Sequence, residues 1–380
     1  MNRSTHSKST RRDFLKSTGQ VAAASALAAA VVPHVHAAED NTIRVALIGC
    51  GGRGTGAAAN ALSVQNGPIQ LVAMADVFAD RLAGSFANLQ KAYADRMDVP
   101  EERRFVGFDA YKKAMDCLKP GDVAMFATPP AFRWVHFSYA LEKGLNVFME
   151  KPVTVDGPAT RRMLELAGKS EAANQKVGVG LMWRHCKARQ ELVSRIKDGQ
   201  VGDVITMRCY RLHGPIGSFA AARKPEGITE VLYQIQRFHS FLWASGGCYS
   251  DFYIHNIDEL CWLKGDWPVE AHALGGRHYR EGSVDQNFDN YSVEYVFPDG
   301  TDLYMYGRCM PGCEDRFSGY VRGSQGLGTI ESMRGGAGIC VAYHGQKETQ
   351  DKLLWRSPDV PNPYQLEWDE LIDAIRHDKP

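Results

Sequence analysis

The run Ile43-Arg44-Val45-Ala46-Leu47-Ile48-Gly49-Cys50-Gly51-Gly52-Arg53-Gly54 decides the fold of this chain. It begins with a short apolar segment typical of a buried strand and continues with the spacing G-x-G-x-x-G. Glycines at these positions allow a tight turn and let backbone N–H groups approach a pyrophosphate at the N-terminus of a helix expected over residues 54–64. The run therefore predicts a dinucleotide-binding loop made of Gly49, Gly51, Gly52, Arg53 and Gly54.

The next apolar run, residues 69–75, predicts a second strand that ends at Asp76. This carboxylate follows the last glycine of the loop by about 20 residues, where an acid would accept hydrogen bonds from ribose hydroxyls. A carboxylate there would also repel a 2′-phosphate, so we favour NAD over NADP. Arg53 and Arg81 are nearby cations that leave NADP open.

Apolar runs and amphipathic segments continue to alternate in the first half of the chain, which predicts a doubly wound parallel sheet with right-handed crossovers. The expected strands cover residues 123–127 and 146–149, and the expected helices cover residues 80–96, 108–118 and 134–143.

Two groups of residues follow directly after strands of this sheet: Thr128-Pro129-Pro130 and Glu150-Lys151-Pro152. Ligands of open α/β sheets bind at the carboxyl ends of the strands. We therefore expect Thr128, Pro129, Glu150 and Lys151 at the cofactor site. Taken alone, a Thr-Pro pair is more often a simple strand terminator, and such a lysine is more often a solvated loop residue.

The second half of the chain has a different sequence pattern, in which strand-like runs are joined by tight turns. Pro298-Asp299-Gly300-Thr301 reads as a hairpin turn. Strands are expected over residues 177–182, 204–212, 269–274, 291–297, 302–308 and 328–332, and helices over 157–173, 190–198 and 368–377. The pattern predicts a Rossmann domain over residues 42–155, followed over residues 156–380 by an α+β domain with a largely antiparallel sheet.

A third segment with residues suited to acid/base chemistry runs from Gly246 to Asp258. If it is helical from Ser250 onward, Asp251 and His255 are i and i+4 neighbours on one face. A carboxylate beside an imidazole is a general acid/base arrangement, but a structural pair on the helix surface is an equally good interpretation. No third ligand stands nearby in the sequence, so we expect no metal site.

The N-terminus has the features of an export signal. Ser9-Thr10-Arg11-Arg12-Asp13-Phe14-Leu15-Lys16 is a twin-arginine pattern, an alanine-rich run follows over residues 21–32, and Val35-His36-Ala37 offers a cleavage site. The apolar run is shorter than the ~20 residues of a spanning helix, so we expect no stable membrane anchor. Residues 1–38 are thus expected to engage the twin-arginine export machinery and to send a folded protein, with its cofactor tightly bound, to the periplasm or medium.

Composition limits the partners. The 380 residues carry 44 Lys plus Arg and 44 Asp plus Glu, and this balance argues against nucleic acid, which normally needs a basic face. It fits a small neutral substrate. The nine cysteines are an odd number, and Cys309 and Cys313 lack a companion pair at zinc-site spacing. We expect ordinary thiols, with a local disulfide as the alternative.

The motifs, taken together and in this order, resemble those of the Gfo/Idh/MocA (glucose-fructose oxidoreductase, inositol dehydrogenase and rhizopine catabolism) family. The shared features are the glycine loop, the acid after the second strand, Thr128-Pro129 with His136 downstream, Glu150-Lys151-Pro152, and Gly-Gly followed by Asp-x-x-x-His. The resemblance runs from Thr42 to the end of the sequence. It implies a Rossmann domain followed by a domain with an open, mostly antiparallel sheet that serves homo-oligomer contacts. It also implies one more helix after His377.

The resemblance also implies roles for individual residues. Lys151 would hydrogen-bond the reacting oxygen, His255 would be the general base, and Asp251 would orient His255 or bind a neighbouring hydroxyl. Arg184 and Tyr253 would line the substrate, while Tyr249 or Tyr253 is an alternative acid/base because this helix is more aromatic than the family's. His136 is expected to pack rather than react.

These expectations converge on an exported NAD(P)-dependent oxidoreductase that moves a hydride between a nicotinamide cofactor and the CH–OH group of a sugar or polyol. One alternative is a glycosidase that uses bound NAD for transient oxidation and elimination. The other is a non-catalytic, secreted carbohydrate-binding protein that kept the fold.

Overall fold

The computed structural model describes residues 41–332 and 336–380. The expected signal segment, residues 1–38, lies outside these residues. In the described part of the chain, no helix is both long and apolar enough to cross a membrane.

The first half of the chain forms a parallel sheet of six strands in the order β3-β2-β1-β4-β5-β6. This order reverses direction on either side of β1, which is the doubly wound arrangement. The strands are β1 (Ile43–Ile48), β2 (Ile69–Asp76), β3 (Arg104–Val106), β4 (Val123–Phe126), β5 (Asn146–Met149) and β6 (Val177–Val179).

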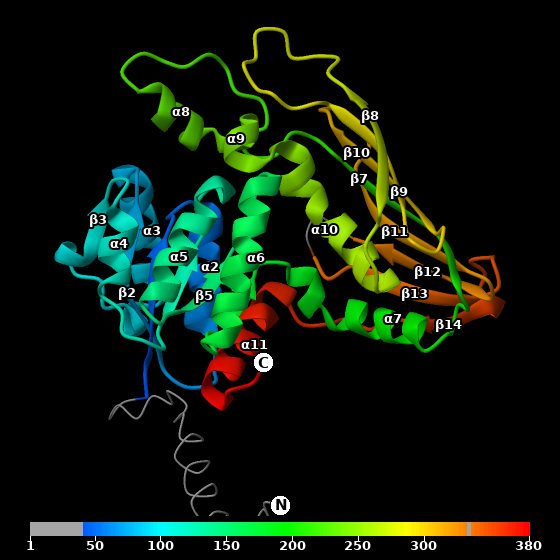
Figure 1. Cartoon of the computed structure of the whole chain (residues 1–380), viewed down its shortest axis with the longest axis horizontal. Helices are drawn as coiled ribbons and strands as arrows, with labels where there is room; N and C mark the ends of the chain where they lie inside the picture. The colour runs from blue at the N-terminus through cyan, green and yellow to red at the C-terminus, as the bar shows by residue number, and fades with distance from the viewer. Residues whose placement is uncertain (1–40, 333–335) are drawn as a thin grey trace, which may run out of the picture.

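Helices cover both faces of this sheet (Figure 1). One face packs against α2 (Gly52–Ser63), α3 (Ala79–Ala92) and α11 (Pro363–His377). The other packs against α4 (Ala110–Met115), α5 (Arg133–Glu142) and α6 (Gly157–Ala172). Strands buried on both faces read as continuous apolar runs, and this is why the sequence predicts β1, β2, β4 and β5 well, whereas the short, partly exposed β3 was not expected.

The second sheet has eight strands in the order β14-β13-β12-β11-β7-β10-β9-β8. Every neighbouring pair is antiparallel except β7 and β10, which are parallel. The strands are β7 (Val204–His213), β8 (Glu270–Gly276), β9 (Asn290–Val296), β10 (Asp302–Cys309), β11 (Arg316–Gly323), β12 (Gly326–Glu331), β13 (Ile339–His344) and β14 (Leu353–Arg356). The expected fold class, a Rossmann sheet followed by a mostly antiparallel one, is confirmed.

Two helices cover the face of the second sheet that looks toward the first domain, α7 (Lys187–Lys197) and α10 (Gly247–Lys264). The shorter α8 (Glu230–Gln236) and α9 (Leu242–Ser245) lie in the segment between β7 and α10. Among residues 41–332 and 336–380, no helix lies on the opposite face of the sheet (Figure 1). The second domain is therefore a two-layer structure with one uncovered sheet face.

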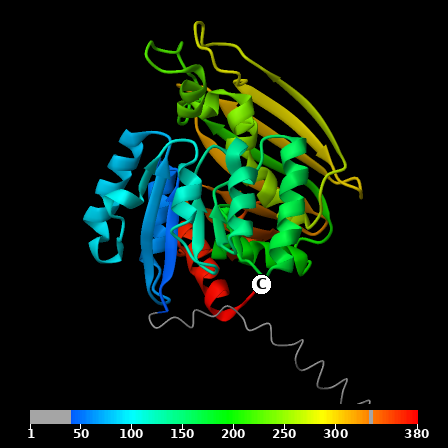
Figure 2. The same cartoon turned by 60° about the vertical axis from the view of Figure 1, so that its left-hand side comes forward.

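The first sheet extends beyond the boundary expected at residues 155 and 156. Strand β6 pairs with β5, and α11, from the far end of the chain, packs against α2 (Figure 2). Strands β11, β13 and β14 were not expected from the sequence, because they are interrupted by glycines or too short to show a clear alternation.

Candidate active site

The glycine loop between β1 and α2 has the geometry that its spacing predicts. Gly49 has a φ of +97°, and a Cβ there would lie 2.7 Å from the carbonyl carbon of Ala127. A Cβ on Gly54 would lie 1.9 Å from the carbonyl oxygen of Gly49. In contrast, a Cβ on Gly51 or Gly52 would meet nothing within 4 Å. The first and last glycines thus serve close packing, and the middle two leave space for a ligand.

The N-terminus of α2 is suited to an anion. The helix begins at Gly52, and its N-cap residue, Gly51, provides no side chain that could accept hydrogen bonds from the first amides. The N–H groups of a first helical turn have no partner within the helix, and the helix dipole favours negative charge there. The open space beside Gly51 and Gly52 therefore fits a diphosphate.

Asp76 lies at the end of β2, next to this loop. Its Oδ2 accepts a hydrogen bond from the Cys50 amide at 2.6 Å, and its Oδ1 accepts one from the Phe78 amide at 2.9 Å. Burial raises the pKa of Asp76, while these amides and the charge of Arg81 oppose the increase. Each carboxylate oxygen has a second acceptor position, so Asp76 can fix the loop and still bind a ribose hydroxyl.

A cavity of about 860 Å³ opens in front of the glycine loop and reaches the second domain. Thr128 and Pro129 lie in its wall, as does His136, whose Nδ1 is 3.2 Å from Thr128 Oγ1. Burial, together with the charge of Arg133, lowers the pKa of His136 to about 3, so this imidazole is neutral. The buried position of His136 agrees with the expectation that this residue packs rather than reacts. From the second domain, Ser218 and His239 complete the wall.

Lys151 and Asp251 meet although 100 residues separate them in the sequence. Lys151 Nζ lies 3.3 Å from Asp251 Oδ1 and also donates to the backbone oxygen of Asp251. The other carboxylate oxygen, Oδ2, lies 3.4 Å from Nε2 of His239. Helix α10 thus places one buried carboxylate between an ammonium group at the end of β5 and an imidazole of the cavity wall.

His239 was not predicted as a site residue. It lies in a short 3-10 helix, Phe238–Ser240, between α8 and α9, where the sequence shows neither a strand end nor a motif. Its ring packs against Phe238 and Phe252. The only sequence signal is a histidine between aromatic residues upstream of the Gly-Gly pair, and such a signal does not distinguish a site residue from a core residue.

His255 lies one turn after Asp251, as expected, but it is buried beside the Trp183 ring, with the ring centroids 5.2 Å apart. Burial is the main reason why its pKa falls well below the usual value, and the charges of Lys151, Arg211 and Arg189 add to this effect. Among the described residues, the histidine that Asp251 contacts is His239 and not His255. The expected orientation of His255 by Asp251 does not fit this geometry.

Glu150 and Arg53 form an ion pair, and of the two only Arg53 lines the cavity. Arg53 Nε donates to Glu150 Oε1 at 2.6 Å, and the guanidinium lies 4.6 Å from the ring centroid of Tyr364. Glu150 is only 5% exposed. This pair connects the glycine loop with the residue before Lys151, and the predicted cofactor contacts of Arg53 and Glu150 stay a prediction.

Arg184 and Tyr253 do not reach the cavity. Arg184 forms a forked pair with Asp258 on α10, with N–O distances of 2.8 and 2.7 Å. Tyr253 is fully buried, and its ring fills the space above Gly307 of β10. Because Tyr253 follows Asp251 by two residues, it points about 200° away around the helix. Neither residue lines the cavity, and their predicted substrate contacts stay a prediction.

The fold and this cavity define a two-domain protein with a Rossmann domain whose loop fits a dinucleotide. Residues 43–179 match the model of the GFO_IDH_MocA family, described as an oxidoreductase family with an NAD-binding Rossmann fold. This match covers the first domain and agrees with the resemblance found in the sequence.

Curated relatives are similar over part of the chain. The rhizopine catabolism protein MocA of Rhizobium meliloti is 22% identical over 210 residues, which are 54% of this chain and 58% of that protein. Inositol 2-dehydrogenase 4 of Saccharopolyspora erythraea is 27% identical over 184 residues, 47% of this chain and 46% of that protein. The matched segments thus span about half the length of these relatives.

Solved structures share the fold over most of the chain. An aldose-aldose oxidoreductase from Caulobacter crescentus, complexed with glycerol, has a TM-score of 0.67 at 17% identity, covering 89% of this chain and 90% of that one. The myo-inositol 2-dehydrogenase from Lactobacillus plantarum has a TM-score of 0.61 at 19% identity, covering 89% of each chain. At these identities the similarity establishes the architecture.

Proposed function

We propose that this protein is an NAD-dependent oxidoreductase that acts on a CH–OH group of a sugar or polyol. The observation that carries the proposal is the cavity of about 860 Å³, with the glycine loop on one side and His239 on the other. His239 contacts Asp251, and Asp251 contacts Lys151. The dinucleotide site therefore shares its cavity with His239, and Asp251 and Lys151 lie behind this imidazole.

The nicotinamide, when bound, supplies the acceptor or donor of a hydride. The chain supplies the rest: the amides of α2 hold the diphosphate, and Thr128 and Pro129 flank the ring. Lys151 donates a hydrogen bond to the reacting oxygen and is kept in place by Asp251. Two imidazoles with lowered pKa, His239 and His255, lie near this pair and are neutral at physiological pH. A neutral imidazole can accept the proton of the substrate hydroxyl.

The arrangement of charges supports NAD rather than NADP. Asp76 places a carboxyl group in the cavity wall beside the glycine loop, and Arg53 Nε donates to Glu150. The remaining nearby cation, Arg81, stacks on Phe78 and donates to the backbone oxygen of Gln236 at 3.2 Å. Both arginines also line the cavity, so the preference for NAD rests on the carboxyl group of Asp76.

A carbohydrate substrate is supported by the relatives, several of which are named as dehydrogenases or oxidoreductases of inositols and sugars. The test begins with native mass spectrometry of the purified protein, which should detect retained NAD. Incubation with myo-inositol, glucose and an aryl glycoside follows. Net NADH or an oxidised product supports a dehydrogenase, whereas free sugar with NAD unchanged would identify the glycosidase alternative.

The role of Lys151 separates an enzyme from a binding protein. Lys151→Ala should reduce turnover by about 10²-fold or more while NAD stays bound, because the lysine acts on the reacting oxygen. Lys347→Ala, at an exposed position far along the sequence, is the control and should behave as wild type. Turnover of Lys151→Ala at the wild-type rate would exclude the proposed site.

We also propose export by the twin-arginine route, supported by Arg11, Arg12 and the short apolar run after them. In a bacterial host with this pathway, the full chain should appear in the periplasm and lose its N-terminal segment. Replacing both arginines by lysine should keep it in the cytoplasm. The same distribution of the wild type and the double-lysine variant between periplasm and cytoplasm would contradict the proposal.

A homo-oligomer is proposed through the uncovered face of the second sheet. This face carries Tyr210 stacked on Tyr306, with centroids 5.4 Å apart, and Tyr320 edge-on to Tyr210. Aromatic residues on an open sheet face are typical of subunit contacts. Light scattering should show more than one subunit, and Tyr306→Lys should shift the protein toward the monomer. A monomeric wild type would contradict this.

A further inference from the structure

The loop after β7 brings a serine to the cavity wall beside His239. Ser218 Oγ lies 3.1 Å from Nδ1 of His239, and the backbone N–H of Ser218 donates to the same nitrogen over 3.3 Å. Both residues line the cavity that contains the glycine loop. A nitrogen that accepts an N–H bond carries no proton, so these contacts assign the proton of neutral His239 to Nε2.

The other nitrogen of His239 faces a carboxylate. Nε2 is 3.4 Å from Asp251 Oδ2. The charged groups around the imidazole are Asp251, which raises its pKa, and Lys151 and Arg81, which lower it together with burial, the largest effect. A hydroxyl on one nitrogen and a carboxylate beside the other is the arrangement by which histidine deprotonates a hydroxyl and is then stabilised as a cation.

Nδ1 of His239 already contacts Ser218, and Nε2 carries the proton beside Asp251, so the substrate proton can reach Nδ1 through Ser218. The Ser218 hydroxyl lies in the cavity wall and can accept one hydrogen bond while donating another. We propose that Ser218, His239 and Asp251 form a proton relay in which Ser218 Oγ contacts the reacting hydroxyl of the substrate. The proposal rests on the oxidoreductase function given above and assigns the proton path of that reaction.

The step balances as follows. The carbinol carbon loses its hydrogen, with both bonding electrons, to the oxidised nicotinamide. The carbinol oxygen gives its proton to Ser218 Oγ, and Ser218 gives its own hydroxyl proton to Nδ1 of His239. The products are a carbonyl, a reduced nicotinamide and an imidazolium beside Asp251. The reverse sequence protonates the alkoxide during reduction.

The backbone around the relay holds the Ser218 loop close to the His239 ring. Gly217 has a φ of +56°, and a Cβ there would lie 2.7 Å from Cε1 of His239, so only glycine lets the loop approach the ring. The Ser240 hydroxyl donates to the backbone oxygen of Ser218. Asn287 donates to the backbone oxygens of both Phe219, at 3.0 Å, and His239, at 2.8 Å. The two segments of the relay are thus held by the same side chain.

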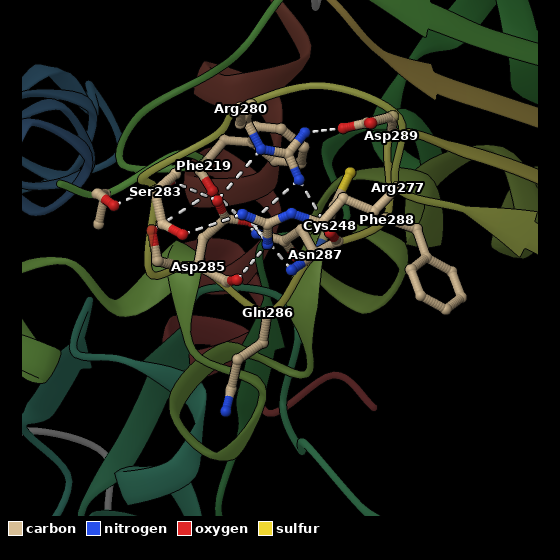
Figure 3. A network of polar contacts seen from close by, with 12 residues as sticks. Phe219, Cys248, Arg277, Arg280, Ser283, Asp285, Gln286, Asn287, Phe288 and Asp289 are labelled. Carbon is tan, nitrogen blue, oxygen red and sulfur yellow. Dashed lines mark hydrogen bonds and ion pairs between the residues drawn. The ribbon is translucent and has the colours of Figure 1, made fainter. Parts of the chain in front are cut away.

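Asn287 belongs to a buried polar network in the loop between β8 and β9 (Figure 3). The Asp285 carboxylate accepts hydrogen bonds from the backbone N–H of Asn287 at 3.0 Å and from the Arg280 guanidinium at 3.1 Å. The Arg280 guanidinium lies over the Phe219 ring, 4.6 Å from its centroid. Asp285 is 5% and Asn287 1% exposed. The network fixes Phe219 and, next to it, Ser218.

The kinetic test uses the full chain loaded with NAD and the best substrate among myo-inositol, glucose and glycerol. Ser218→Ala should slow hydride transfer, followed by stopped-flow NADH fluorescence, by about 10²-fold. Ser218→Thr keeps the hydroxyl and should restore most of the rate. NAD affinity should stay within about twofold, since the serine acts on the proton. Ser194→Ala, on the exposed surface of α7, is the matched control and should match wild type.

The pH profile distinguishes the relay from a structural role. In wild type the rate should fall at low pH as His239 becomes protonated, and His239→Gln should lose this dependence along with most of the rate. A Ser218→Ala variant with the wild-type rate and pH profile would overturn the relay alone. A wild type that binds NAD but oxidises none of the three probes would overturn the proposed function, and the relay with it.

An NMR measurement tests the geometry independently of turnover. With ¹⁵N-labelled histidine, the signals lost in His239→Gln should show the tautomer protonated on Nε2, and Asp251→Asn should shift them. His272→Gln, at an exposed strand position, is the assignment control. A His239 protonated on Nδ1 in wild type would contradict the relay whatever the substrate.

Discussion

Asp76 illustrates how one side chain serves both fold and function. Two backbone amides, of Cys50 and Phe78, fix its orientation and link the glycine loop to the end of β2. Burial makes this carboxylate harder to ionise, and the amides offset part of that cost. Asp76 also lines the cavity, so the residue that stabilises the loop is the one we propose to bind the ribose hydroxyls.

We expect Asp76→Ala to weaken NAD binding by about tenfold or more, because a charge-assisted hydrogen bond is lost. NADP binding should weaken less or improve, since the repulsion of the 2′-phosphate is removed. Fluorescence titration with both dinucleotides measures the ratio. Asp359→Ala, on the exposed surface, is the control. An unchanged ratio of NAD to NADP affinity would show that Asp76 does not select the cofactor.

Glu367 is a second residue whose charge state depends on its surroundings. It is 2% exposed, and neither carboxyl oxygen has a hydrogen-bond partner among the described residues. Burial, and then the charge of Glu150, raise its pKa to about 9, with Arg53 opposing. The folded state thus keeps the proton that the unfolded state releases near the ordinary pKa of a glutamate.

A raised pKa in the folded state stabilises the fold fully below the unfolded value, and this contribution is lost as pH rises toward about 9. Glu367→Gln replaces the carboxyl with a neutral group of similar shape. We expect it to raise the free energy of unfolding by about 1 kcal/mol or more at pH 8, and much less at pH 5. Denaturant unfolding at both pH values measures this. A gain of equal size at both would contradict it.

Among the secondary-structure elements, α2 and α10 bring the chemistry together in different ways. Helix α2 does so through its N-terminus, where glycines replace side chains. Helix α10 does so through the sides on which its residues lie. Asp251 is on the side of Lys151 and His239, while Tyr253 is on the side of the second sheet. Both helices are defined by local sequence, but the partners of Asp251 come from distant segments.

The glycines of the loop give a matched pair of variants. A Cβ on Gly51 has open space around it in the protein but would occupy the region proposed for the diphosphate. Gly51→Ala should therefore abolish NAD binding while the melting temperature of the NAD-free protein stays unchanged. Gly54→Ala, which forces a Cβ against the oxygen of Gly49, should lose binding and also stability, by about 1–3 kcal/mol. If Gly51→Ala binds NAD normally, the proposed diphosphate position is wrong.

In the whole molecule, α11 brings together segments that are far apart in the sequence, because it packs against α2 of the first domain. Trp368 of α11 is fully buried in the core of the first domain and stacks on Phe148 of β5, with centroids 4.4 Å apart. Tyr364, from the same helix, stacks on Arg53 of the glycine loop. The Rossmann domain is thus completed by residues that follow the second domain in sequence.

Trp368→Ala should reduce the free energy of unfolding by about 3–5 kcal/mol, as expected for the loss of a large buried aromatic side chain. NAD binding should weaken at the same time, because Tyr364 no longer holds Arg53 in place. Thermal unfolding and NAD titration measure both effects. Trp355→Ala, in β14 of the second domain, is the control and should leave NAD binding unchanged. Wild-type stability of Trp368→Ala would show that α11 does not complete the first domain.

Much of the fold follows from the sequence because its signals are local. The strands of the first sheet are apolar runs that end at Gly49, Asp76, Thr128 and Glu150, and the ends of these strands coincide with the site. The strands β3, β11, β13 and β14 were missed, because long-range pairing, and not their own residues, makes them strands. The same reason explains why His239 carried no signal.

The sequence by itself determined the glycine loop, the acid that follows β2, and the presence of Asp251 and His255 on one helix. Each of these depends on residues within about one or two turns of structure, where spacing fixes geometry. Only the tertiary structure decided that Asp251 contacts His239 and Lys151, that Tyr253 faces the core, and that α11 closes the first domain. These contacts join residues far apart in the chain, and burial in the folded protein selects them.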